Sequence, residues 1–232
     1  MNYLYTPPET HIDGGFGVTA INFSEAADGL RESSNPMLGI LPICYLRRHS
    51  IELFLKSIIL ILHKKFSIPF GDGFSVDKPA ILTKGNKWQL ISNTHNLQDL
   101  YGYFIKVLSI CKCNMPNVYC WDIPSKIKKK INLIDGYDPK STYFRYPDST
   151  NSTQDSKKHA VKKTNIKSIS KKIRASNSAV HALLIIDEND CVVDSYEMKK
   201  SPLPDVLSSL NELNDFFAEW HYSLRRVLNS GN

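Results

Sequence analysis

The chain has no segment that combines the length and the low charge of a membrane span. Its longest apolar candidate, Pro36 to Leu62, carries five ionisable groups near its middle, and charge at the centre of a bilayer is costly. The opening residues, MNYLYTPPETHIDGG, do not contain the basic region followed by an apolar segment that is typical of a secretory signal. We therefore expect a cytoplasmic protein that is not associated with a membrane.

Cysteine is scarce, and its spacing does not suit a metal site. The five cysteines are Cys44, Cys111, Cys113, Cys120 and Cys191. An odd number in a chain without a visible signal indicates free thiols in a reducing compartment. The C-x-C-x6-C spacing of CKCNMPNVYC lacks paired CxxC motifs and an obvious fourth ligand, so we expect no zinc.

Common enzyme motifs are also missing. The sequence contains no P-loop, no dinucleotide-binding glycine motif, no nucleophile elbow and no HExxH. Most common enzyme classes are left without support, and no cofactor is indicated.

Positive charge, by contrast, is concentrated. The chain has 232 residues and a formal net charge of +6, and residues 148–178 contain few large apolar side chains. This segment is predicted to be a mobile basic insertion. Its basic residues, with no acidic residue among them, are Lys157, Lys158, Lys162, Lys163, Lys167, Lys171, Lys172 and Arg174. Such a run either binds a phosphate backbone or is a solvated loop. Lys162, Lys163, Lys171 and Lys172 are candidate substrate-binding residues, together with Arg145, which lies outside the run.

Apolar periodicity predicts a mainly α-helical protein. Helices are expected over residues 19–33, 35–65, 94–111, 124–134 and 204–228. Thr94 is expected to cap the third of these helices, and the last carries a strong apolar stripe from Val206 to Val227. Pro42 either kinks the second helix or marks its start. Residues 66–93 read as a long loop with short strands, and AVHALLII and CVVDSY around DEND predict a β-hairpin.

These elements predict a simple domain organisation. Residues 1–18 are expected to form an irregular lead-in. Residues 19–232 are expected to form one helical-bundle domain of four to five helices. That domain would carry the small β-hairpin and the long basic loop.

The second predicted helix contains charges that its apolar surroundings do not explain. At 3.6 residues per turn Tyr45, His49, Glu52, Lys56 and His63 lie close to one line. This polar stripe is either the solvent face of an amphipathic helix or part of an inward-facing polar pocket shared with a neighbouring helix. An imidazole, a carboxylate and cationic side chains can together hold an anion and move a proton.

Three strings, YLRRHSIELFLKSII, THNLQDL and FRYP, occur in this order between residues 45 and 147. Over roughly Leu38 to Pro147 they resemble a group of bacterial helical proteins related to the HEPN (higher eukaryotes and prokaryotes nucleotide-binding) superfamily. The resemblance implies a bundle of four or five helices that is often dimeric. It also implies either an RNase of toxin–antitoxin, phage-defence or RNA-processing systems or a non-catalytic binding module.

The chain departs from that family at the RNase motif. Active members usually carry Arg, four residues and then His on one helix, but no histidine here has an arginine five positions before it. Arg48 and His49 are the candidates from a different register. Arg48 would hold phosphate, and His49 or His95 would be the general acid or base.

Glu52, Lys56 and His95 complete the expected catalytic site, and Arg145 is a candidate substrate-binding residue beside it. Glu52 and Lys56 would orient the acid and base. In the resembling proteins the histidine of the THNLQDL-type motif packs toward the arginine and glutamate helix, so His95 is expected near His49 and Glu52. Arg145 has an aromatic setting that orients its guanidinium either toward an anion or toward Glu52, and we favour the ion pair with Glu52.

Three functional hypotheses follow. The first is an RNA- or nucleotide-binding, HEPN-like homodimer that acts as a metal-independent RNase in phage defence or a toxin–antitoxin system. The second is a non-catalytic protein-interaction subunit whose protein partner is encoded nearby. The third is that the lysine-rich segment alone binds nucleic acid and the helical bundle only carries it.

Overall fold

A computed structural model of the chain describes residues 7, 10–33, 39–117, 119–139, 141–145, 160–175, 179–199 and 201–229. The chain divides into two compact units. The helical unit comprises Met1–Pro147 and Val206–Asn232, and the sheet unit comprises Asp148–Asp205. Within the described ranges, no helix has the length and apolar character needed to cross a membrane.

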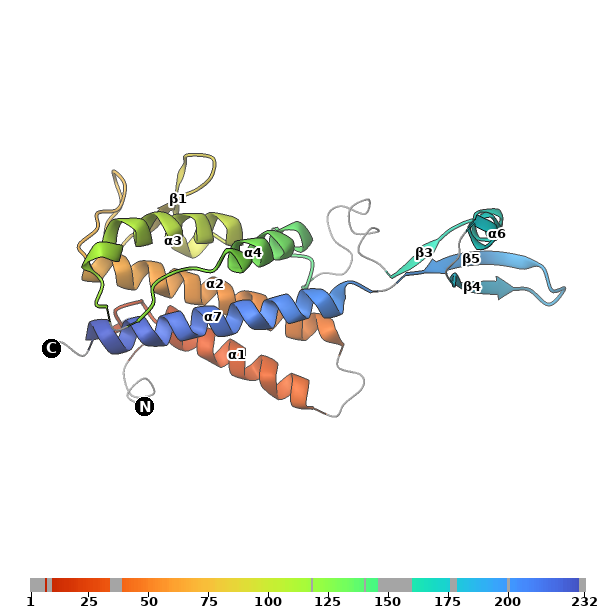
Figure 1. The fold of residues 1–232 in the computed structure, drawn as a ribbon, viewed down its shortest axis with the longest axis horizontal. Coiled ribbons are helices and arrows are strands. Elements are labelled where there is room, and N and C mark those ends of the chain that lie inside the picture. The colour runs from red at the N-terminus through yellow and green to blue at the C-terminus, as the bar shows by residue number, and fades with distance from the viewer. Residues whose placement is uncertain are drawn as a thin grey trace. The chain divides into compact units, whose positions relative to one another are not determined.

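The helical unit is built around one central helix. Its helices are α1 (Phe16–Glu32), α2 (Ile40–Lys65), α3 (Leu97–Cys111), α4 (Ser125–Tyr137) and α7 (Leu203–Asn229). Helices α1 and α3 pack against α2, α4 packs against α3, and α7 runs along the bundle (Figure 1). The predicted mainly helical fold is confirmed, with the first helix starting three residues before the expected Thr19.

Helix α2 is buried over nearly its whole circumference. Every residue from Ser50 to His63 is buried, which explains why the sequence reads as almost continuously apolar. Pro42 lies in the first turn, where its missing N–H costs no helical hydrogen bond. Pro42 thus lies at the true start of the helix. Residues 35–38 of the predicted helix lie outside the described residues.

Helix α7 buries the apolar stripe that the sequence predicts. The spacing of its buried residues alternates between four and three, as in Val206, Leu210, Leu213, Phe217, Trp220 and Leu224. Phe104 of α3 meets Phe217 and Trp220 edge-on, with ring centroids 6.2 and 5.3 Å apart. Each such aromatic pair contributes about 0.5 to 1.5 kcal/mol beyond the burial of area. These contacts hold α7 against α3.

Short elements connect α2 to α3. Strands β1 (Ala80–Leu82) and β2 (Trp88–Leu90) pair antiparallel, so the short strands predicted in this loop are confirmed. A 3-10 turn, Ile91–Asn93, leads to α3. The cap of α3 is Asn96, whose side chain accepts the N–H of Asp99, and not Thr94 as the sequence indicates.

The sheet unit is more regular than the sequence predicts. It contains β3 (Val161–Lys163), α6 (Ile166–Ala175), β4 (His181–Ile186) and β5 (Val192–Met198), with antiparallel strands in the order β3-β5-β4. The predicted hairpin is confirmed as β4 and β5. The prediction of a long basic loop is wrong for residues 161–175, which form a strand and a helix. Residues 148–159 and 176–178 of that predicted insertion lie outside the described part of the chain.

Candidate functional site

Three charged side chains on successive turns of α2 form one buried cluster. A terminal nitrogen of Arg48 lies 3.0 Å from Glu52 Oε2, and Lys56 Nζ lies 3.0 Å from Glu52 Oε1. All three side chains are buried, Arg48 and Glu52 completely. The i, i+4 spacing lets one helix bring two cations to a single carboxylate.

Groups from outside α2 complete this cluster. His95 Nδ1 lies 2.9 Å from Glu52 Oε1, and Arg48 donates to the His95 carbonyl at 2.7 Å. Asp138 Oδ2 lies 3.3 Å from Arg48 Nε, near enough for an ion pair although the two atoms are not aligned for a hydrogen bond. Asp138 follows α4, and its other oxygen accepts the N–H groups of Thr142 and Tyr143.

The charges of this cluster are balanced within the protein. Burial acts to raise the pKa of Glu52, but the nearby Lys56 and Arg48 more than offset it and hold the pKa below its ordinary value. Two buried cations therefore face two buried carboxylates, Glu52 and Asp138. Arg48 is fully buried and committed to these partners, so it is not placed to hold a phosphate from solvent as the sequence hypothesis requires.

His95 is the only member of the cluster that reaches the surface substantially. Its side chain is 48 % exposed, while Glu52 behind it is fully buried. The expected proximity of His95 to Glu52 is confirmed. A histidine held through Nδ1 by a carboxylate presents its other ring nitrogen outward, which is the arrangement of an oriented general acid or base.

His49 lies outside the hydrogen-bonded cluster. Its ring meets Phe23 edge-on and stacks on Tyr45, with centroids 4.5 and 6.0 Å away. Its Nδ1 is buried and has no hydrogen-bond partner among the described residues. Burial is the main effect that lowers the pKa of His49, so the ring is neutral at pH 7. The predicted stripe is thus divided, because His49 packs against aromatic rings while Glu52 and Lys56 join Arg48.

The last histidine of the predicted stripe also lies in a place of its own. His63 stacks between Phe70 and Tyr103, with centroids 4.1 and 5.7 Å away. Its Nδ1 lies 2.9 Å from the Ile68 carbonyl and its Nε2 lies 3.1 Å from the Tyr103 hydroxyl. Both ring nitrogens have hydrogen-bond partners and the side chain is buried, so His63 has a structural role.

The expected ion pair between Arg145 and Glu52 is wrong. Arg145 donates to the Ser141 carbonyl at 2.7 Å and to the Ser141 hydroxyl at 3.0 Å. Its guanidinium lies over the Tyr45 ring, 5.4 Å from the centroid. The residue near this segment that does join the cluster is Asp138, which pairs with Arg48.

The sequence analysis missed a second buried polar group. Ser57 donates to Asp13 Oδ2 at 2.6 Å and lies 2.9 Å from His221 Nδ1, and all three side chains are completely buried. Asp13 also accepts the N–H of Gly17 at 2.9 Å. The serine lies between the carboxylate and the histidine and has no access to solvent, so this group ties α1, α2 and α7 together and is not a catalytic triad.

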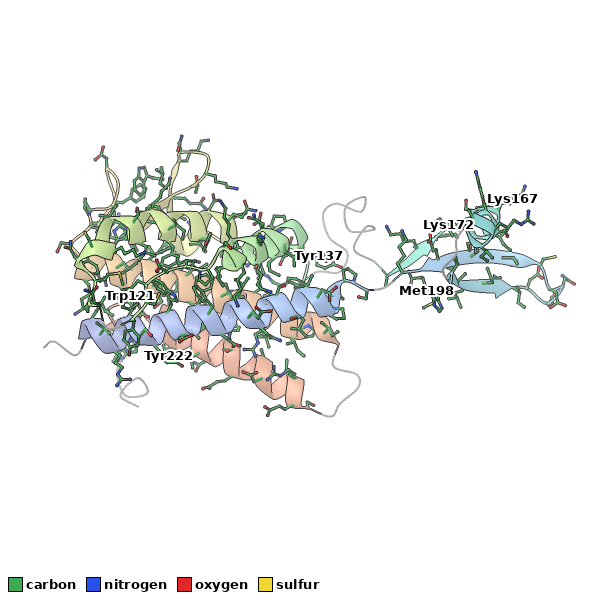
Figure 2. All side chains as sticks on the ribbon, viewed as in Figure 1. Trp121, Tyr137, Lys167, Lys172, Met198 and Tyr222 are labelled. Atoms are coloured by element: carbon green, nitrogen blue, oxygen red, sulfur yellow. The ribbon has the colours of Figure 1, made fainter. Side chains whose placement is uncertain are left out.

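A basic surface covers α6 in the sheet unit. Lys167, Lys171 and Arg174 are exposed and follow one another at i, i+4 and i+7, which places them on one face of the helix. None of the three forms an ion pair with a described acidic residue. Lys172 pairs with Glu197 at 2.6 Å and Lys163 pairs with Asp194 at 2.5 Å. Figure 2 labels Lys167 and Lys172 on this helix.

The predicted site residues therefore divide between the two units. Arg48, Glu52, Lys56 and His95 form one contiguous cluster, while His49 and Arg145 lie beside it in other contacts. Lys162, Lys163, Lys171 and Lys172 belong to the sheet unit. Within the ranges that the structure describes, no group of His, Cys, Asp and Glu is arranged to hold a metal ion.

Comparison of the chain with models of known protein families, with curated proteins and with solved structures finds no match.

Proposed function

We propose that this protein binds the phosphate backbone of RNA through the basic surface of its sheet unit. The observation that carries the proposal is the row formed by Lys167, Lys171 and Arg174, three exposed cations on one face of α6 without acidic partners among the described residues. Cations that are not neutralised within the protein bind phosphates by releasing counterions. Lys162 lies on β3, the strand that precedes this helix, opposite Glu197 of β5.

Backbone binding of this kind carries no sequence information. The basic residues of α6 are lysines and one arginine, which suit phosphate contacts. This helix has no aromatic side chain that could stack on a base. We therefore expect affinity that depends strongly on salt and weakly on sequence. The resemblance to the HEPN superfamily is what favours RNA over DNA, and it would place the protein in phage defence or a toxin–antitoxin system.

Neutralising the row on α6 tests this proposal. The triple variant Lys167→Ala, Lys171→Ala, Arg174→Ala removes three phosphate contacts. The negative slope of log affinity against log salt should therefore become shallower by about 2 to 3. The measurement is fluorescence anisotropy with a labelled single-stranded RNA at several salt concentrations.

A matched control exists in the helical unit. Lys126, Lys128 and Lys129 of α4 are also exposed lysines close together in the sequence. Their triple replacement by alanine removes the same formal charge and should leave the slope unchanged. An equal effect of the two triple variants would show that only net charge matters, and the proposal would fail.

A second candidate function, metal-independent RNA cleavage, is favoured by one observation. His95 is half exposed and bonded through Nδ1 to the buried Glu52 carboxylate. His95 would act as the general base or acid on the ribose hydroxyl, Glu52 would orient it, and Arg48 and Lys56 would set the charge around Glu52. His49, neutral at pH 7, would be the second acid or base.

The cleavage hypothesis makes a direct prediction. Wild-type protein incubated with RNA in EDTA should cleave it, and His95→Gln should reduce the rate by about 100-fold or more, the usual contribution of a general acid or base. His63→Gln is the control, because His63 is a buried histidine away from the Glu52 cluster. Equal inactivity of wild type and variants would remove the enzyme hypothesis while leaving RNA binding intact. It would also favour the alternative of a non-catalytic interaction subunit.

A further inference from the structure

Strand β4 forms an edge of the three-stranded sheet and is unusually apolar for an edge. The strand order β3-β5-β4 leaves one side of β4 without a neighbouring strand among the described residues. All six residues of β4 are exposed, and the exposed fractions of Leu183, Leu184, Ile185 and Ile186 are 51, 44, 45 and 56 %. A long, uncharged edge of this kind is a template for pairing with another strand.

The opposite edge of the same sheet is protected. Strand β3 is three residues long, and two of its residues are Lys162 and Lys163. Short length and lysine are two of the ways in which proteins prevent edge-to-edge association. The contrast indicates that β4 is an edge that the fold leaves available for pairing.

We propose that β4 pairs antiparallel with β4 of a second copy of this chain, which joins the two sheets into one of six strands. This inference does not depend on the proposed RNA binding. In an antiparallel pair, directly opposite residues lie on the same face of the sheet, and side chains alternate between the two faces along a strand. In a two-fold dimer, even-numbered residues must therefore lie opposite even-numbered residues, and odd opposite odd. Centring the pair on Leu184 satisfies this condition and sets Leu183 opposite Ile185 of the second copy.

Charge complementarity supports a second copy as the occupant. The turn after β4 carries Asp187, Glu188 and Asp190. The other end of β4 has an excess of positive charge. The depression beside His181 is lined by Lys172 and its ion-pair partner Glu197, and this single carboxylate is surrounded by Lys162, Lys172 and Lys199. Antiparallel pairing brings the acidic turn of each copy to the basic end of the other, so the dimer contains this contact twice. His181 would lie opposite Asp187 of the second copy.

The local geometry of β4 permits this register. The sheet has an irregularity where Ile185 pairs with Asp194 and Ile186 pairs with Val192. The extra residue, Val193, belongs to β5, so β4 keeps its regular alternation up to Ile186. The second copy would then pair the free backbone N–H and C=O groups of β4, and the apolar side chains of the two strands would lie side by side on each face.

Sedimentation of the full-length protein over a range of concentrations tests the association. The wild type is expected to be a dimer at micromolar concentration, and Leu184→Lys to be a monomer, because two lysines would face each other at the axis. Val161→Lys is the control, since Val161 is equally exposed at 44 % but lies on the other edge. A monomeric wild type, or a dimer insensitive to Leu184→Lys, would overturn the proposal.

Cross-linking tests the register. In a background with the exposed Cys113, Cys120 and Cys191 replaced by serine, Leu184→Cys should form a disulfide-linked dimer on oxidation, because directly opposite Cα atoms lie about 4.5 to 5.5 Å apart. Ile186→Cys should not, since the two copies of residue 186 would be about 13 Å apart along the strands. Efficient cross-linking through Ile186→Cys instead would contradict the register centred on Leu184.

Discussion

Glu52→Gln is expected to lower the free energy of unfolding by about 3 to 5 kcal/mol, the usual cost of removing one partner from a buried ion pair. The replacement keeps the size of the side chain, removes its charge and turns one of its two acceptor oxygens into an NH2 donor. The remaining amide oxygen can replace the carboxylate for only one of the two cations. Lys56 would keep the Ser92 carbonyl, 3.3 Å away, and Arg48 would keep Asp138 and the His95 carbonyl. The loss is large against a total stability of about 5 to 15 kcal/mol. Urea denaturation followed by circular dichroism measures it.

Two controls separate the buried charge from charge in general. Glu212→Gln removes an exposed carboxylate that pairs with Lys130 and Lys126 on the surface, and it should leave the unfolding midpoint nearly unchanged. Adding Lys56→Met to Glu52→Gln should restore part of the lost stability, because the stranded cation is removed. A cost below about 1 kcal/mol for Glu52→Gln would show that the cluster is effectively solvated.

The pH dependence of stability provides an independent check of the same cluster. The pKa of Glu52 is held below its ordinary value in the folded state by Lys56 and Arg48 against the opposing effect of burial. The carboxylate therefore contributes stability that is present above its unfolded-state pKa and is lost as the pH falls through the folded-state value. Glu52→Gln should remove this part of the acid-induced loss.

Much of the helical unit can be predicted from the sequence because long apolar periodicities survive in the structure. The stripe of α7 is buried at the positions that its spacing indicates, and α2 is found within a few residues of its expected start. The error for the cap of α3 is local. Thr94 and Asn96 are both good capping residues, and only the backbone geometry decides between them.

The polar cluster is predictable only in part, because periodicity along one helix does not reveal which neighbour supplies the counter-charge. Glu52 and Lys56 meet as their i, i+4 spacing indicates, but Arg48 joins them and His49 does not. Asp138 was missed altogether. Its only signal in the sequence is an Asp-Pro pair, which indicates a turn. One oxygen of Asp138 accepts the N–H groups of Thr142 and Tyr143 in such a turn, and the other oxygen faces Arg48.

The sequence indicates too little regular secondary structure in the sheet unit, for a different reason. Residues 161–175 contain three isoleucines at helical spacing, Ile166, Ile169 and Ile173, but the surrounding lysines dominate the composition. Only Ile169 of these three is buried, at 4 % exposure, against the sheet. A helix with a single well-buried anchor gives a weak apolar signal. The pairing of β3 with β5 is not visible in the local sequence, because 28 residues separate the end of β3 at Lys163 from the start of β5 at Val192.

Gly17→Ala is expected to destabilise the helical unit by about 2 to 5 kcal/mol, because it overpacks a closed polar group and breaks its hydrogen bonds. A Cβ at this position would lie 2.2 Å from His221 Cε1 and 2.6 Å from Asp13 Oδ2. Neither residue can move freely. Asp13 holds the first turn of α1 and the Ser57 hydroxyl, and His221 is fully buried against Phe54.

Gly29 supplies the matched control within the same helix. A Cβ at Gly29 meets no atom within 4 Å, so Gly29→Ala should stabilise the protein by about 0.5 to 1 kcal/mol through helix propensity alone. Opposite signs for the same substitution in one helix, measured by urea denaturation, would locate the effect in the contact of Gly17 with His221 and Asp13. If Gly17→Ala were neutral, α1 would not approach α7 as closely as the structure places it. The Asp13–Ser57–His221 group would then not be the link that holds the first helix to the bundle.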